Sequence, residues 1–390
     1  MRGSCFWGLV SRTLAVVVVF AAAGAGCRDG SREERPGEPG LLEMPELALV
    51  WTLTLEGTFE ELFTVRDATV LSDGSIIMSD SRGGAVWRLR PGAGKPELVG
   101  RRGQGPGEFI YPSSVWGLDG GGFEVWDAGQ GRITTFDSSG AVAATWPVEA
   151  SLSGFTEFCS PVKPGTWLVG IRSLPPPATL GLMGRDTVTL RIMSGAGFAS
   201  SHVIRLPYYL LAGHPGRGGV ASGVVKFSSV PQWVTTDTSV LISQLAGAEI
   251  IEYALDGTEL RSVSWRTPAR RVQQDDISRQ ESIWLAQAPE ERRTQVRNAL
   301  PSVIYPEEFP VLSSIHRDPA GWLWAVGYHT SWEASSRWWV FDETMDPVGS
   351  FLGPPLDEVF EVGQDYVLGV RTDDLGVSTL VRFGFNRPLR

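Results

Sequence analysis

Two stretches of this chain share one pattern: residues 70–92 read VLSDGSIIMSDSRGGAVWRLRPG, and residues 117–140 read GLDGGGFEVWDAGQGRITTFDSSG. Each gives a turn, an apolar segment that ends in Asp, a second turn, an alternating segment and a third turn. Alternation with period two and β-branched or aromatic enrichment predict strands, and the Gly, Asp and Ser clusters predict hairpin turns. Asp80 and Asp127 occupy equivalent positions, where we expect each carboxylate to cap a turn.

Weaker copies of the same unit follow along the chain. Segments that match its second strand lie at 166–171, 239–244, 321–326 and 365–370, and segments that match its third lie at 190–193, 249–254, 338–342 and 379–383. Six copies of a four-stranded unit, about 40 to 50 residues long and stretched by insertions, predict an all-β fold, a six-bladed β-propeller. Residues 46–390 then form one domain.

The ends of this domain predict how the ring closes. Residues 47–55 (LALVWTLTL) read as a strand before the first copy, and only residues 384–390 follow the last third strand. We expect residues 47–55 to supply the outer strand of the last blade, so that no long edge is exposed.

Residues 100–109 (GRRGQGPGEF), followed by Tyr111 and Pro112, residues 125–127 and residues 132–137 (RITTFD), resemble the NHL repeat. The resemblance extends over residues 47–383 and is to bacterial six-bladed propellers of the NHL type. It implies an exported or lipid-anchored protein without an assigned activity. Gln130 stands where the repeat usually has Asn.

Residues 1–26 carry Arg2 and Arg12, then an apolar run at 14–23 and small residues before Cys27. The run is about half the length of a membrane span, so we predict a signal peptide and export. The sequence GAGC at 24–27 resembles the lipobox of bacterial lipoproteins, with Gly24 where such boxes usually have Leu. The resemblance implies lipidation of Cys27, a membrane anchor through that lipid, and sorting to the outer membrane. The alternative is ordinary cleavage near Ala25.

Residues 28–40 (RDGSREERPGEPG) are polar and rich in Gly, Pro and Glu. This composition is typical of a flexible tether, which we assign to residues 27–45. Cys5 leaves with the signal peptide and Cys27 carries lipid, so Cys159 has no partner for an intramolecular disulfide.

Composition excludes some partners. The chain has 34 basic and 44 acidic residues, a net charge of -10, and lacks basic runs. An acidic chain of this kind argues against nucleic acid as a partner.

The long insertions all fall in connections that open on one face of a propeller. They are residues 172–186, 207–228, 266–310 and 328–335. The longest, between blades four and five, is predicted to be helical over about residues 268–305. Asp275 and Asp276 are suited to cap a first helix, and Pro289 suits the first turn of a second. Two interpretations remain open: a cover over the ends of blades four and five, or a mobile lid.

No catalytic set emerges from the sequence. The four histidines form no paired metal motif, the GQGPG stretch at 103–107 matches no phosphate loop, and no GxSxG nucleophile is present. We therefore expect no metal site, no cofactor and no catalytic residues. Most of the 15 tryptophans follow strand periodicity, which favours packing between blades.

A binding patch is the remaining prediction. Its residues combine aromatic and arginine side chains in the long connections of blades three to five: Arg172, Tyr208, Tyr209, His214, Arg217 and Trp332. If they meet, they suit an envelope protein, a peptide or a carbohydrate. The first hypothesis is thus an exported, lipid-anchored propeller that acts as a binding or scaffold module in the cell envelope and is not an enzyme. The alternative is a propeller lyase or hydrolase with its active site in the central channel.

Overall fold

The computed structural model describes residues 41–47, 49, 51–57, 59, 64–148, 154–173, 183–195, 197–216, 219–373 and 377–387. The chain divides into two compact units, Met1–Gly40 and Leu41–Arg390. The predicted signal peptide, Cys27 and most of the predicted tether lie outside the described residues.

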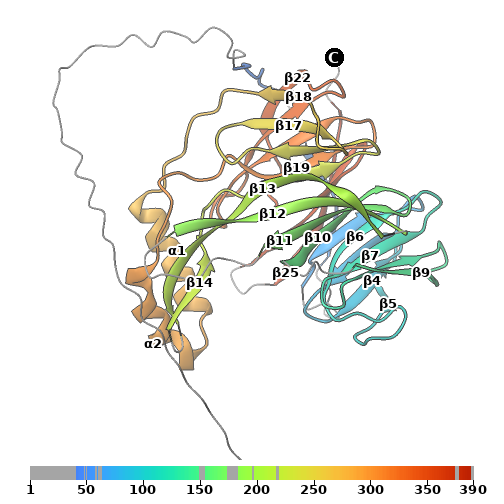
Figure 1. Cartoon of the computed structure of the whole chain (residues 1–390), viewed down its shortest axis with the longest axis horizontal. Coiled ribbons are helices and arrows are strands. Elements are labelled where there is room, and N and C mark those ends of the chain that lie inside the picture. The colour runs from blue at the N-terminus through green and yellow to red at the C-terminus, as the bar shows by residue number, and fades with distance from the viewer. Residues whose placement is uncertain are drawn as a thin grey trace, which may run out of the picture. The chain divides into compact units, whose positions relative to one another are not determined.

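The described strands form six antiparallel sheets (Figure 1). Sheet one consists of β2 (Asp67–Val70), β3 (Ile76–Asp80), β4 (Ala85–Leu89) and β5 (Glu97–Gly100). Sheet two consists of β6 (Pro112–Gly117), β7 (Phe123–Asp127), β8 (Arg132–Phe136) and β9 (Val142–Pro147). Sheet three consists of β10 (Gly154–Lys163), β11 (Thr166–Ser173), β12 (Met183–Ser194), β13 (Gly197–Gly216) and β14 (Gly219–Val224).

The second half of the chain continues the pattern. Sheet four consists of β15 (Trp233–Thr235), β16 (Ser239–Ser243), β17 (Glu249–Ala254) and β18 (Glu259–Ser264). Sheet five consists of β19 (Leu312–Arg317), β20 (Leu323–Gly327), β21 (Arg337–Phe341) and β22 (Pro347–Leu352). Sheet six consists of β23 (Glu358–Val362), β24 (Tyr366–Thr372), β25 (Ser378–Phe385) and β1 (Trp51–Gly57).

The first strands of the six sheets lie around a common centre. β2 contacts β6, β6 contacts β10, β10 contacts β15, β15 contacts β19, β19 contacts β23, and β23 contacts β2 again. This closed circuit of inner strands is the arrangement of a β-propeller, and it leaves a channel between the strands.

The ring closes as the sequence predicts. β1 pairs antiparallel with β25, with Trp51 opposite Phe385 and Gly57 opposite Leu380. An N-terminal strand thereby completes a sheet whose other strands come from the C-terminus. The expected outer strand of the last sheet is confirmed.

A short segment before β1 also packs on the body. Leu42 forms a parallel bridge with Trp265, and Glu46 forms one with Ser350. Arg266 pairs with Glu43 at 2.7 Å, and Leu47 packs against the core between sheets five and six. Residues 41–45 are therefore part of the folded unit, and the end of the predicted tether moves to residue 40.

Sheet three differs from the predicted four-stranded unit. Residues 207–216, expected in a loop, continue β13, which turns into β14 through pairs such as Leu211 with Val224. The long hairpin of β12 and β13 extends away from the other sheets, toward the helices (Figure 1). The sequence missed this extension because Pro207 and the glycines at 213, 216, 218 and 219 interrupt the strand pattern.

Two helices lie between β18 and β19: α1 (Gln274–Gln287) and α2 (Glu290–Ala299), followed by the 3-10 turn η1 (Leu300–Ser302). The N-cap of α1 is Gln273, two positions before Asp275 and three before Asp276. Asp276 reaches back instead and accepts a hydrogen bond from the backbone N–H of Gln273 at 2.9 Å. Within the described residues, no helix is long and apolar enough to cross a bilayer.

Tryptophan and phenylalanine side chains fill the spaces between sheets. Trp126 of sheet two and Trp167 of sheet three share one fully buried cluster. Between sheets five and six, the Trp324 and Phe385 rings lie 5.1 Å apart. The expected packing of strand tryptophans between neighbouring sheets is confirmed for these residues.

Candidate functional site

The central channel contains a cavity of about 590 Å³ among the inner strands of sheets two to five. The turns that follow β6, β10 and β15 form part of its wall, and β19 closes one side. The turns after the first strands open at one end of the channel, and the long connections, which follow the second and last strands, open at the other. The cavity therefore lies toward the end opposite the long connections. Its polar side chains are Asp119, Glu124, Ser160, Lys163, Gln232, Thr235, Thr236, Asp237, Ser314 and His316.

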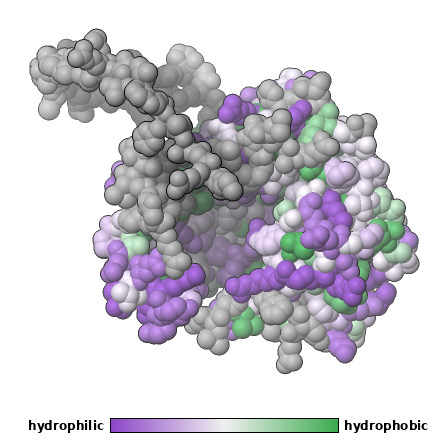
Figure 2. All heavy atoms as spheres, turned by 60° about the horizontal axis from the view of Figure 1, so that its bottom comes forward, coloured by the Kyte–Doolittle hydropathy of each residue, from purple (hydrophilic) through white to green (hydrophobic). Residues whose placement is uncertain are grey.

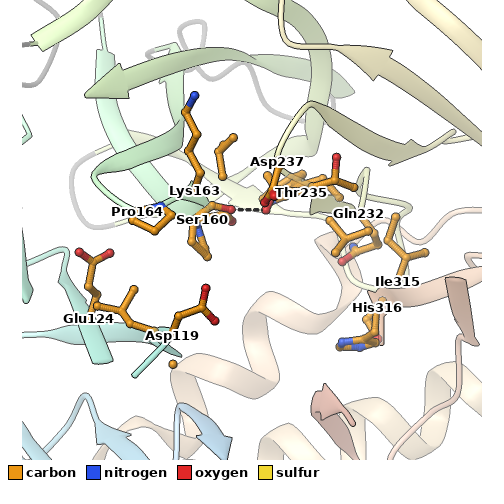
Figure 3. Close-up of a pocket in the computed structure, with 18 residues that line it drawn as sticks. Asp119, Glu124, Ser160, Lys163, Pro164, Gln232, Thr235, Asp237, Ile315 and His316 are labelled. Atoms are coloured by element: carbon orange, nitrogen blue, oxygen red, sulfur yellow. Dashed lines mark hydrogen bonds between the residues drawn. The ribbon is translucent and has the colours of Figure 1, made fainter. Parts of the chain in front are cut away.

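Two of these side chains face each other across the cavity. Asp119 and His316 point into it from opposite sides, whereas Lys163 directs its amine away (Figure 3). His316 Nε2 lies 2.8 Å from Ser314 Oγ, two residues earlier on the same face of β19. Burial lowers the pKa of His316 to about 4, so the imidazole is neutral at pH 7.

Glu124 is a structural carboxylate at the cavity wall. It accepts hydrogen bonds from the indole N–H of Trp116 at 2.9 Å and of Trp167 at 2.7 Å, and from Thr135 Oγ1 at 2.8 Å. These donors belong to sheets two and three. Glu124 therefore joins the two sheets, and its oxygens are occupied by protein donors.

The other end of the channel carries a second acidic group. Asp67, at the start of β2, accepts hydrogen bonds from the backbone N–H of Val115 and of Ala68, both at 2.9 Å. Burial raises the pKa of Asp67 to about 7, and the nearby Glu358 adds to the shift. Arg66 lies 3.8 Å from Glu358.

The predicted binding patch is brought together in part. Arg172 of β11 stacks on the ring of Tyr209 of β13 at 4.5 Å, and the Tyr208 and Tyr209 rings lie 4.3 Å apart. Arg172 also pairs with Asp186, and with Glu157 at 3.5 Å. Tyr208 is only 5% exposed and the Arg172 side chain 14%. These three side chains form a buried network inside sheet three.

Glu157 and Asp186 are the members of this network that sequence reasoning missed. Tyr209 donates to Glu157 at 3.1 Å. The sequence does hold one signal: Asp186 shares the buried face of β12 with Val188 and Leu190. An acidic residue at a position where the strand alternation places apolar, buried side chains indicates a buried ion pair.

Trp332 lies in a different environment. Its ring is 6.3 Å from Phe227, which in turn lies 5.0 Å from Phe309 and 5.8 Å from Tyr305. Trp332 also lines a shallow groove along α1 with Ile283. His214 has no described side chain, and Arg217 lies outside the described residues.

Asp80 and Asp127 cap turns, as predicted. The Gly83 N–H donates to Asp80 at 2.8 Å, and the N–H groups of Ile110 and Tyr111 donate to Asp127 at 2.9 Å. Gln130, which stands where the NHL repeat usually has Asn, donates a hydrogen bond from its side-chain amide to Asp127 at 2.7 Å. Cys159 is buried on β10.

The cavity residues carried no motif in the sequence. Asp119 and Asp237 lie in tight turns, and these turns meet only because their strands surround one channel.

Within the part of the chain that the structure describes, no group of three or more His, Cys, Asp or Glu side chains is arranged to hold a metal ion. The face shown in Figure 2 is hollowed, with hydrophilic side chains around the hollow.

No family model matches this sequence, and no curated protein matches it. Solved structures do resemble it. A member of the DUF4221 family from Bacteroides vulgatus superposes with a TM-score of 0.51 at 10% identity, over 88% of this chain and 99% of that protein. A candidate exported protein from Bacteroides fragilis superposes with a TM-score of 0.49 at 11% identity, over 87% of this chain and 95% of that protein. Virginiamycin B lyase from Staphylococcus aureus superposes with a TM-score of 0.43 at 9% identity, over 86% of this chain and 99% of that protein. At this identity the likeness to the DUF4221 protein concerns the fold alone: this chain is a β-propeller.

Proposed function

We propose that this chain is an exported, lipid-anchored, six-bladed β-propeller that acts as a binding or scaffold module in the cell envelope. Its interaction face is formed by the long connections of sheets three to five. The partner is an envelope protein, with a peptide or carbohydrate as the other classes the surface suits. Cys27 carries the lipid, and residues 28–40 form the tether.

One observation carries the choice of this face. Phe227, Tyr305, Phe309 and Trp332 form an aromatic cluster, and they come from three separate connections: the one after β14, the one that holds the helices, and the one between β20 and β21. Arg270 strengthens the same junction by pairing with Glu333 at 2.7 Å and donating to the Tyr328 carbonyl at 2.7 Å. Ordered connections on a rigid scaffold are the usual place for recognition.

The cluster also favours one interpretation of the helices. Trp284 of α1 lies 6.4 Å from Tyr305, whose ring in turn contacts Phe227. The helices are thus joined to the body through contacts between aromatic rings, which supports a fixed cover rather than a mobile lid. The exposed side chains of α2, such as Gln295 and Arg297, then form the outer surface for a partner.

The test is site-specific photocrosslinking of the full-length protein in its native envelope. A photoreactive residue replaces Gln295 on α2, and the matched control replaces Ser139, an exposed residue in the tight turn between β8 and β9. We expect one dominant captured protein from position 295 and none from position 139. Equal capture at both positions, or no capture at 295, contradicts this interaction face.

The alternative, a lyase or hydrolase with a central-channel site, is favoured by Asp67. A carboxyl group with a pKa of about 7 in a channel suits general acid–base catalysis. Both of its oxygens, however, accept backbone hydrogen bonds that join β2 to β6 and to its own strand. This geometry supports a structural role, so we keep binding as the proposed function.

A further inference from the structure

We propose that the cavity in the central channel is a binding site for an uncharged, hydroxyl-rich small molecule of the saccharide class. The site is independent of the interaction face proposed above, because it lies toward the opposite end of the channel. A molecule bound there leaves the aromatic cluster and the helices free.

The size and construction of the cavity fit a small ligand. A volume of about 590 Å³ falls within the range of roughly 300–1,000 Å³ that is typical of small-molecule sites. Four sheets contribute to the wall, so the position of each lining group is fixed by the packing of the ring. Such a site is preformed, which lowers the entropic cost of binding.

The charges of the cavity disfavour an anion. Among the described residues that line the cavity, Lys163 is the only lysine or arginine, and it directs its amine away from the space (Figure 3). His316 is neutral at pH 7 because burial lowers its pKa to about 4. An anionic ligand would therefore lose its hydration without gaining a positive partner.

The free hydrogen-bonding groups favour a ligand rich in donors. Asp119 and Asp237 make no hydrogen bond or ion pair among the described residues, so both carboxylates are available as acceptors. Both are exposed on turns, where solvent and salt screen their charge and weaken selection for a cation. Hydroxyl groups donate well to carboxylates. The neutral imidazole of His316, whose Nε2 pairs with Ser314, offers its Nδ1 to a ligand hydroxyl group.

The remaining wall is apolar. Leu118, Val162, Trp233 and Ile315 line the space between the polar groups. A saccharide ring presents C–H faces to such side chains and hydroxyl groups to the polar ones. The combination of apolar wall, carboxylate acceptors and neutral imidazole thus points to an uncharged, hydroxyl-rich ligand.

The experiment is saturation-transfer NMR on the full-length chain in a detergent without sugar headgroups. The probes are glucose, galactose, N-acetylglucosamine and their linear oligomers up to four units, with gluconate as the anionic and spermidine as the cationic comparison. We expect saturation transfer to at least one neutral sugar. The variant Asp119→Asn/Asp237→Asn should weaken that binding by about tenfold, because each change removes a charged acceptor.

The matched control is Glu259→Gln/Glu307→Gln, which removes two exposed carboxylates that lie outside the cavity lining. It should bind like the unchanged protein. Neutral-sugar binding that survives the Asp119/Asp237 change overturns the location. Binding of gluconate or spermidine alone overturns the ligand class, and silence of every probe overturns the site.

Discussion

Single carboxylates hold neighbouring sheets of this ring together. Glu124 and Asp67 are carboxylates whose oxygens receive donors from neighbouring sheets. A buried carboxylate that lacks such donors is strongly destabilising, so each acid matters through the bonds that it accepts. The two differ in environment: Glu124 binds indole and hydroxyl donors, whereas Asp67 binds backbone N–H groups beside another acid.

Glu124→Gln should lower the free energy of unfolding by about 3 kcal/mol. The amide nitrogen would face donors from Trp116, Trp167 or Thr135 and leave at least one of them without an acceptor. Urea denaturation followed by tryptophan fluorescence measures the loss. The neighbouring exposed change Asp119→Asn serves as the control and should cost less than about 0.5 kcal/mol. Similar losses for both variants would refute the assigned role of Glu124.

Asp67 should make stability depend on pH. Its pKa rises from 3.8 to about 7 on folding, so the folded protein keeps a proton that the unfolded chain releases between these values. The free energy of unfolding should therefore fall as the pH rises through this window, by about 2.5 kcal/mol between pH 5 and pH 8. Urea titrations at the two pH values measure the change.

Asp67→Asn should remove this pH dependence, because the amide does not titrate while its oxygen still accepts from Val115. Asp237→Asn removes a carboxylate from an exposed turn and should keep the pH dependence of the unchanged protein. A steep fall that persists in the Asp67 variant would assign it to another group.

Among the elements, β1 closes the ring. It completes sheet six, and Trp51 at its start lies 5.9 Å from Trp338, 5.8 Å from Phe351 and 5.5 Å from Phe385. The first two rings belong to sheet five and the third to sheet six. β1 thus closes the ring both by backbone pairing and by packing between two sheets.

Trp51→Ala should lower the free energy of unfolding by about 2 kcal/mol, since it leaves a cavity between sheets five and six. Leu53→Ala is the matched control on the same strand, because Leu53 is 47% exposed and should cost less than about 1 kcal/mol. Differential scanning calorimetry of both variants tests the difference. Equal transition temperatures for the two variants would show that β1 closes the ring by backbone pairing alone.

For the whole molecule, the segment before β1 decides where the proposed tether joins the folded unit. Residues 41–47 run along sheets four and five, so the chain enters the body at the outer edge of sheet four, where Leu42 pairs with Trp265. The proposed tether of residues 28–40 would span at most about 45 Å when fully extended. A lipid at Cys27 would therefore keep the propeller close to the membrane.

Cys27→Ser should release the protein from the membrane fraction into the soluble fraction of the envelope. In cells fed an alkyne fatty acid, only protein with Cys27 should carry the label. Cys159→Ala is the matched control, because Cys159 is a buried thiol of β10, and it should stay labelled and membrane-bound. Membrane retention and labelling of the Cys27 variant would contradict the proposed anchor.

The repeated pattern of residues 70–92 and 117–140 determined by itself the all-β character and the capping role of Asp80 and Asp127, because both follow from local alternation and turn chemistry. The alternation of residues 47–55, with few residues left after the last copy, likewise determined the closing strand. The tertiary structure alone decided which distant groups meet. Arg172 and Tyr209 contact Glu157 and Asp186 across neighbouring strands. Trp332 packs on Phe227 instead. Asp119 faces His316 across the channel. These contacts depend on strand register and on the closure of the ring, which bring together residues up to about two hundred positions apart, and periodicity carries no information at that range.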